Sequence, residues 1–244
     1  MKRLKIFLML VFCLIAFLVN AQSNEKWDYP VKLGSEEWRM TSYAEKVEKS
    51  QPPKEILNSW NTELLFKYCI DYPFNGVVWF FNNPNDGFRR VYEQSTVWQE
   101  FIYRKNALDV FVKYFEERPY KRLFEMKDVE KRNNELFTLF FLEKLVSETN
   151  FTFHLDSTEK RKLAITILQT HQSKKEFPND FFGFPYISSL SAHIKILESD
   201  KELSSNDEIS LLKFREKMGN ESFVDDDMES AIISKVLNFI NKYI

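Results

Sequence analysis

Histidines are the first residues to consider for acid–base or metal chemistry, because the chain contains only three of them. His171 continues the apolar face of a helix predicted over residues 158–173, and His193 lies among aliphatic residues. We interpret both as packed histidines. If their helices form an antiparallel hairpin, the two rings approach each other and could bind a metal ion with Glu176 or Glu198. The spacing does not require such a site, and no metal is predicted.

The third histidine, His154, stands two residues before Asp156. Asp156 and Glu159 have the spacing of a capping box, in which each side chain accepts a hydrogen bond from the backbone at the start of a helix. We therefore interpret Asp156 as a helix N-cap rather than as a metal ligand or as the group that orients a catalytic histidine.

The other candidates for catalysis show no positional pattern. Cys69 follows Leu65 by one helical turn on an apolar face, which favours an inert buried thiol over a nucleophile. Residues 225–227 are all aspartates, but they lack the alternating ligands and the turn glycine of a calcium loop and favour a helix N-terminus. Serine-nucleophile, zinc and phosphate-loop motifs do not occur in the sequence. No catalytic residue and no cofactor is predicted.

Aromatic residues give the best functional lead. Residues 177–186 place five aromatic rings in a connection interrupted by proline. Such rings either fill the core or form a platform for a sugar, a peptide or a protein partner. The candidate binding residues are Phe181, Phe182, Phe184 and Tyr186. We expect Phe184 to be buried and Phe181 and Phe182 to be more exposed.

The elements that must position these residues are predicted to be helices. The chain has only five glycines, fewer than the tight turns of a strand-rich fold of this length require. Amphipathic spacing indicates helices over 107–117 and 158–173, and near the start of the mature chain it places Met40, Tyr43, Ala44 and Val47 on one face. The helix predicted over 128–149 is apolar on most sides in its second half, so it should be central.

Two further helices are predicted toward the C-terminus. Ser205 and Glu208 mark the start of one, and Gly219 marks its end. The three aspartates at 225–227 open the last helix. Its expected apolar face consists of Ile233, Val236, Leu237, Ile240 and Ile244.

Two segments have the composition of strands but no partner strand. Residues 77–81, Val-Val-Trp-Phe-Phe, are interpreted as a short buried helix, and residues 151–153 as an extended connection. In total we expect eight or nine helices in an all-α fold. The preferred arrangement is an irregular superhelix of helical hairpins, similar to HEAT repeats, and the alternative is a compact orthogonal bundle. Residues 22–244 form one domain, with a weak seam near 177–185.

The N-terminus predicts export. Residues 2–5 are rich in basic side chains, residues 6–19 form an unbroken apolar run of fourteen, and small or aliphatic residues follow up to Ala21. This is the pattern of a secretory signal peptide over residues 1–21. The apolar run is shorter than the roughly 20 residues that a membrane-spanning helix needs. Cys13 lies too far inside the run to carry a lipid, so no stable membrane anchor is expected after cleavage.

Composition restricts the class of partner. Residues 1–21 contain three basic and no acidic residues, so cleavage changes the formal net charge from −2 to −5. A mildly acidic exported protein is a poor partner for nucleic acid. Cys69 is then the only cysteine, which leaves the fold without a disulfide. The chain has 24 Phe, 10 Tyr and 5 Trp residues, which predicts an aromatic core or a core together with an aromatic surface.

One part of the chain resembles a known group of proteins. The residues that carry the resemblance include Cys69-Ile70-Asp71-Tyr72-Pro73, Phe81-Asn82-Asn83 and Arg104-Lys105-Asn106-Ala107. Over roughly residues 50–115 the sequence is similar to a family of exported, mainly helical proteins of Gram-negative bacteria whose function is unknown. The resemblance implies a helical fold and a periplasmic or surface location, and it implies no activity and no site residues.

Two functions follow as hypotheses. The first is a non-enzymatic helical module that binds a protein or glycan partner in the periplasm or at the cell surface. The alternative is a small hydrolase or lyase that acts on envelope glycan or peptide. A deep pocket that brings together two carboxylates with shifted pKa values would favour the enzyme.

Overall fold

The computed structural model describes residues 27–32, 34–176, 184–201 and 226–242, and the side chains of 184–186 are not described. In these residues all regular structure is helical, which confirms the predicted all-α class. The 3-10 helices are labelled η. The elements are α2 (Glu36–Met40), α3 (Tyr43–Lys49), α4 (Lys54–Ser59), α5 (Thr62–Ile70), η1 (Asn75–Phe80), α6 (Pro84–Gln94), α7 (Thr96–Ile102), α8 (Ala107–Glu116), α9 (Tyr120–Phe124), α10 (Val129–Glu148), η2 (Phe151–His154), α11 (Ser157–Lys175), α12 (Phe184–Ser199) and α14 (Asp226–Lys242).

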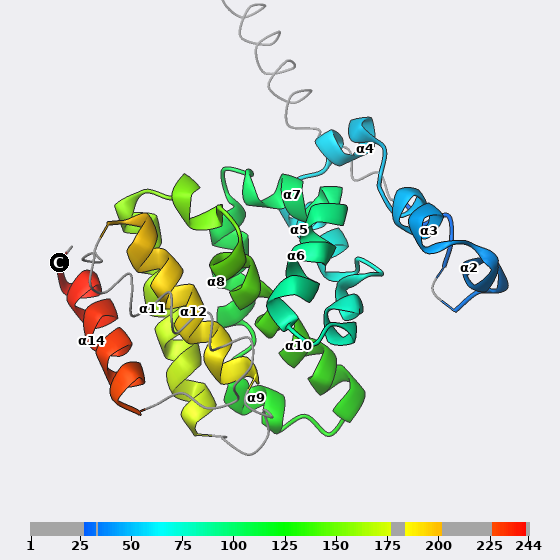
Figure 1. Ribbon diagram of the computed structural model, residues 1–244. Coiled ribbons are helices and arrows are strands. Elements are labelled where there is room, and N and C mark those ends of the chain that lie inside the picture. The colour runs from blue at the N-terminus through cyan, green and yellow to red at the C-terminus, as the bar shows by residue number, and fades with distance from the viewer. Residues whose placement is uncertain (1–26, 33, 177–183, 202–225, 243–244) are drawn as a thin grey trace, which may run out of the picture.

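The long helices form the centre of the molecule (Figure 1). Helix α12 packs against both α10 and α11, and α14 covers α11 and α12 from outside. On the other side, α10 contacts α6, and α5 contacts α7 and α8. The central position predicted for the helix over 128–149 is therefore confirmed. These contacts do not establish a regular superhelix of helical hairpins.

Aromatic rings join the N-terminal helices to α10. The ring of Trp98 in α7 stacks on Phe141 of α10 with centroids 5.0 Å apart and planes inclined by 29°, and the Phe88 ring of α6 lies 4.8 Å from Phe141. All three side chains are buried. Phe111 of α8 and Phe140 of α10 are buried as well, as the apolar faces of the helices predicted over 107–117 and 128–149 lead one to expect. Since several other rings are exposed, the protein has both an aromatic core and an aromatic surface.

Predicted helix starts agree with the structure where a side chain caps the backbone. Asp156 and Glu159 form the expected capping box at the start of α11. Asn61 accepts a hydrogen bond of 2.8 Å from the backbone N–H of Leu64 at the start of α5. Asp128 caps α10 in the same way. These signals are local, so the sequence alone can reveal them.

One predicted helix face was wrong, and another was right for Val236 and Ile240, which are buried, but not for Leu237. Met40 and Ala44 are exposed and belong to different helices, because Ser42 starts a new helix with its own capping box at Glu45. In α14 the buried face includes Ile232 and Phe239, while the predicted Leu237 is 43% exposed. The face is turned by about one residue position, and only contacts with α11 and α12 fix that rotation.

Both strand-like segments are 3-10 helices. Residues 151–153 are not an extended connection, because they belong to η2, where Phe151 and Thr152 are buried. Residues 77–80 fall in η1, as the helical interpretation expected, but the predicted burial holds only for Val78 and, in part, for Val77. The exposure of the residues that follow Val78 is the main departure from the prediction.

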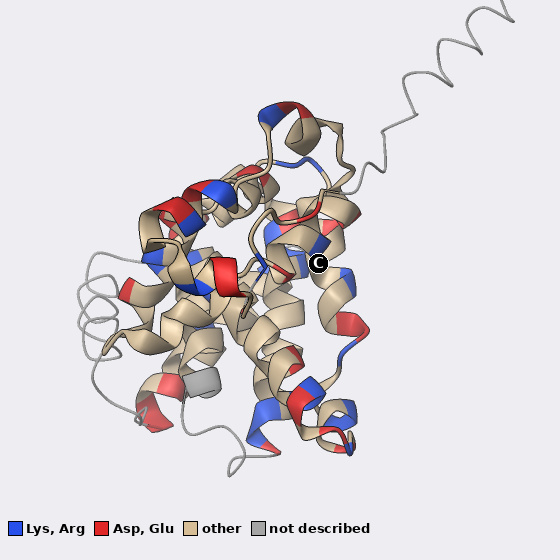
Figure 2. Cartoon of the chain, turned by 90° about the vertical axis from the view of Figure 1, so that its right-hand side faces the viewer, with Lys and Arg blue, Asp and Glu red and all other residues tan. Residues whose placement is uncertain are grey.

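Several predictions concern residues outside the described ranges. These are the signal peptide at 1–21, the helix between Ser205 and Gly219, and the seam near 177–185. Among the described helices, none has the length and apolar character to cross a membrane. Figure 2 shows acidic and basic residues mixed over the helices in that view, without a stripe of one sign.

Candidate functional site

A glycine in α6 determines where η1 lies. A Cβ atom at Gly87 would stand 2.6 Å from the carbonyl oxygen of Val78 and 2.9 Å from its Cα atom. A Cβ atom essentially never makes contacts that short, so glycine at this position allows the backbone of η1 to approach α6 this closely. Gly87 and Val78 are both buried in the contact.

An asparagine fixes the other end of η1. The side-chain amide of Asn75 donates hydrogen bonds of 2.8 and 2.9 Å to the carbonyl oxygens of Cys69 and Ile70, at the C-terminal end of α5. Its amide oxygen accepts a hydrogen bond of 3.0 Å from the indole nitrogen of Trp98. Since every one of these groups is at least half-buried, η1 is held rigidly between α5, α6 and α7.

Three aromatic residues emerge where η1 ends, and we call Trp79, Phe80 and Phe81 the aromatic ridge. Their exposed fractions are 51%, 86% and 39%. The ridge packs against α10. The Trp79 ring stacks on Phe140 with ring centroids 5.4 Å apart, and its centroid lies 5.6 Å from that of Phe137. An exposed run of large apolar side chains on a rigid base is typical of a binding surface.

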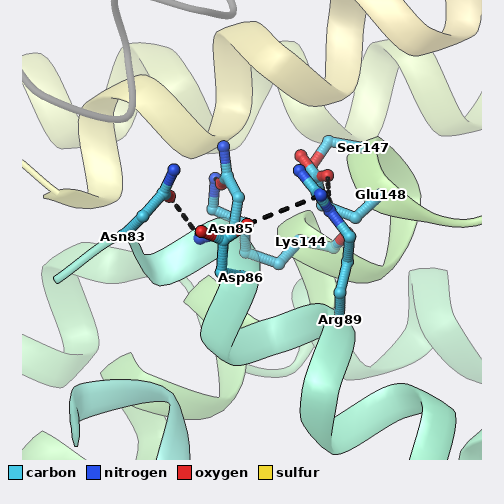
Figure 3. A network of polar contacts seen from close by, with 7 residues as sticks. All are labelled: Asn83, Asn85, Asp86, Arg89, Lys144, Ser147 and Glu148. Carbon is cyan, nitrogen blue, oxygen red and sulfur yellow. Dashed lines mark hydrogen bonds and ion pairs between the residues drawn. The ribbon is translucent and has the colours of Figure 1, made fainter. Parts of the chain in front are cut away.

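A network of polar side chains joins α6 to α10 and begins at Asn83, two residues after the ridge (Figure 3). It consists of Asn83, Asn85, Asp86, Arg89, Lys144, Ser147 and Glu148. Arg89 forms ion pairs with Asp86 at 3.5 Å and with Glu148 at 3.4 Å. The ammonium group of Lys144 donates a 2.5 Å hydrogen bond to the amide oxygen of Asn85. Arg89 thus pairs with one carboxylate on its own helix, α6, and with one on α10, and Lys144 of α10 binds Asn85 of α6.

A second, buried network lies between α10, α11 and α12. Glu143 and Lys174 have fully buried side chains and form an ion pair with N–O distances of 2.6 and 2.7 Å. The hydroxyl of Ser188 donates to the same carboxylate, and Lys174 also lies 5.5 Å from the ring centroid of Tyr120. Burial raises the pKa of Glu143 and lowers that of Lys174, while the contact between them opposes both shifts.

His171 connects this region to α14. Its Nδ1 atom lies 2.9 Å from the hydroxyl of Ser189, and its Nε2 atom lies 3.1 Å from a carboxylate oxygen of Glu229. Burial is the main reason why the pKa of His171 falls to about 4. Burial also acts to raise the pKa of Glu229, but hydrogen bonds with Lys175 and His171 outweigh it and lower that pKa.

A hydroxyl, an imidazole and a carboxylate in this order are the groups of a nucleophilic relay. However, Ser189 is completely buried, and the His171 ring is 1% exposed. Three hollows of about 260 to 330 Å³ are lined by described residues of α5 and α8–α11 and the loops beside them, and Ser189 lines none of these three. His171 and Glu229 do not line these three hollows either.

The two histidines approach each other as the hairpin interpretation expected. The rings of His171 and His193 are buried, with centroids 6.4 Å apart. Neither of the suggested partners, Glu176 and Glu198, is the carboxylate that His171 contacts, because Glu229 occupies that position. Among the described residues no group of three or more histidine, cysteine or acidic side chains has the geometry of a metal site.

The predicted binding residues are not tested by the geometry. Phe181 and Phe182 lie outside the described residues, and Phe184 and Tyr186 fall in α12 without described side chains. Cys69 is the buried free thiol that the sequence predicted, and burial raises its pKa well above the usual value. The sequence reasoning missed the ridge because it took the apolar run at 77–81 as wholly buried. The Asn-Asn-Pro-Asn sequence that follows was the available signal for a surface position.

Comparison with known proteins adds no identity. No family model, no curated protein and no solved structure matches the chain. What the fold and the ridge define is an all-helical protein with a rigidly held aromatic surface.

Proposed function

We propose that the protein is an exported, non-enzymatic binding module of the periplasm or cell surface, and that the aromatic ridge is its recognition surface. The observation that carries the proposal is the exposure of three consecutive aromatic residues, of which Phe80 is 86% exposed. When a ligand covers apolar surface of this kind, the binding free energy becomes more favourable by about 25 cal/mol for each Å² removed from water. A flexible loop would lose conformational entropy when it became ordered on binding, and this loss would offset part of the favourable free energy. The position of η1 is already fixed by Gly87 and Asn75 before a ligand binds.

A photo-crosslinking amino acid at position 80 tests this proposal in the envelope of cells that produce the protein. The control is the same amino acid at position 153, because Phe153 is 54% exposed but belongs to η2. We expect a discrete adduct from position 80 and none from position 153. Excess wild-type protein should suppress the adduct, and a variant with serine at 79, 80 and 81 should not. Equal adducts at both positions would refute the ridge as the recognition surface.

Export is tested separately by the mass of the mature protein. Cleavage after Ala21 predicts that protein recovered from outside the cytoplasm begins at Gln22. Protein that retains Met1 and stays with the membrane fraction would contradict both the location and the mature net charge.

The relay of Ser189, His171 and Glu229 favours the hydrolase as a second candidate. A fluorophosphonate reagent reacts with activated serine hydroxyls and so tests it directly. Labelling of the wild-type protein that disappears in Ser189→Ala would support an enzyme that acts on envelope peptide or glycan. Because Ser189 is fully buried, we expect no labelling of the native protein.

A further inference from the structure

We infer that the aromatic ridge recognises an uncharged glycan, with its rings stacked on the sugar and the neighbouring asparagine amides bound to sugar hydroxyls. The inference rests on the proposed function, because it names the ligand class of the same surface.

The first argument is the absence of charge in the ridge and the sequence around it. Residues 73–85 contain no acidic or basic side chain, although 29% of the whole chain is charged. In the adjoining network Arg89 forms ion pairs with Asp86 and Glu148, and Lys144 is buried and donates a hydrogen bond to Asn85. An anionic polysaccharide, a phosphate group or a charged peptide would therefore lose hydration here without gaining a partner of opposite charge.

The second argument is the kind of polar group that borders the rings. Asn82 is exposed and follows the ridge directly, and Asn83 is partly exposed. The amide oxygen of Asn83 accepts a 2.9 Å hydrogen bond from the backbone N–H of Asn85, and its nitrogen points away from Asn85 (Figure 3). Amides both donate and accept, as hydroxyl groups do, so they suit a ligand that carries many hydroxyls.

The third argument is size. A whole aromatic side chain buries about 150 to 250 Å², so the exposed fractions of the three rings together offer on the order of 300 to 400 Å². A stable protein interface takes about 800 Å² from each partner. The ridge is too small for such an interface by itself, whereas a short stretch of sugar rings matches it in area. Sugar rings also present apolar C–H faces, which pack on aromatic rings.

Titration of the mature protein with defined uncharged hexasaccharides, followed by tryptophan fluorescence, tests the inference. The probes are β-1,4-glucose, α-1,4-glucose and β-1,4-N-acetylglucosamine hexamers. Oligogalacturonate and vesicles of phosphatidylcholine, with and without phosphatidylglycerol, serve as charged and lipid probes. Trp79→Phe removes the half-exposed reporter, and it identifies the part of the signal that comes from the ridge.

We expect saturable binding of at least one uncharged hexamer, with little change between low and high salt. Phe80→Ser should weaken this binding at least about tenfold, and the matched control Phe153→Ser should leave it unchanged. Because Phe80 is 86% exposed, its replacement should not unfold the protein, and thermal unfolding of the variant verifies this.

Other outcomes overturn the inference in distinguishable ways. Binding only to oligogalacturonate or only to vesicles would assign the ridge a different ligand class. A protein crosslinked through position 80, with no response to any uncharged hexamer, would overturn the glycan ligand and leave the ridge as a recognition surface. No crosslink at position 80 and no response to any probe would overturn both proposals.

Discussion

At the scale of single residues, the largest energetic cost lies in burying the charges of Glu143 and Lys174. Two charges with fully buried side chains lose their hydration on folding, and their contacts with each other, with Ser188 and with the Tyr120 ring help to compensate for it. Removing one partner therefore takes away the ion pair while the other charge stays buried. Replacing both partners with apolar residues removes the cost of burying the two charges as well as the attraction between them.

This reasoning predicts a strong non-additivity between the two positions. We expect Lys174→Met to lower the free energy of unfolding by about 3 to 5 kcal/mol, because Glu143 then lacks its cation. The double variant Glu143→Leu with Lys174→Met should recover most of that loss. Urea unfolding of the two single variants and the double variant measures the coupling. Additive losses would mean that the pair is worth little to the fold.

The buried histidines predict a loss of stability in acid. Burial, the largest cause in each case, lowers the pKa of His171 to about 4 and that of His193 to about 3, against about 6.5 in an unfolded chain. At a pH between the folded and unfolded pKa values, the histidines are protonated in the unfolded state but neutral in the folded state. The free energy of unfolding therefore keeps its full value above about pH 6.5. It decreases as the pH falls below that value, by up to about 1.4 kcal/mol per pH unit for each histidine.

Urea midpoints between about pH 7 and pH 5 measure this slope. Removal of one titrating group in His171→Gln should reduce it, while His154→Gln provides a matched control because His154 is exposed. Glu229, Lys174 and Lys175 also face His171, so each variant is compared with the wild type at the same pH. A flat profile in the wild type would contradict the burial of both rings in solution.

At this scale the sequence predicted burial, which depends on neighbouring residues, but not contacts between residues that are far apart along the chain. The apolar neighbours of His171 and His193 predicted two packed rings, and that is correct. The contact with Glu229 joins residues 58 positions apart, and no local pattern records it. The same holds for the pairing of Glu143 with Lys174, which lie 31 positions apart.

At the scale of elements, the close approach of η1 to α6 is the feature on which the ridge depends. Helix boundaries were predictable where capping residues mark them, as at Asp156 and Asp128. The direction in which a short apolar run points was not predictable. Tertiary contacts with Gly87 bury Val78 and leave the next three residues partly or largely exposed.

Two glycines offer a matched test of that contact. Gly87→Ala places a Cβ atom 2.6 Å from the Val78 carbonyl oxygen, so η1 must move, and we expect a loss of about 1 to 3 kcal/mol. Gly76→Ala, within η1 itself, meets no atom within 4 Å and should leave stability unchanged or slightly higher. Urea unfolding measures both. Equal effects would show that the backbone contact does not determine the position of η1.

The whole molecule combines a helical core with an aromatic surface, and these two features were predictable to different degrees. Few glycines and repeated amphipathic spacing were enough to predict an all-α fold, since both are properties of local sequence. The packing of α12 between α10 and α11 was not predictable, because several helices have nearly continuous apolar faces that fit more than one neighbour. The exposed ridge depends on another tertiary contact, the close approach of η1 to α6 at Gly87.

The most direct test of the ridge as a recognition surface separates binding from stability in one variant. Phe80→Ser with Phe81→Ser is compared with the wild type for its melting temperature and for its binding of the partner that crosslinks at position 80. We expect the melting temperature to change by less than about 2 °C, because both side chains are partly or largely exposed, while binding is lost. A sharp fall in the melting temperature, or stable protein with undiminished binding, would contradict the assignment.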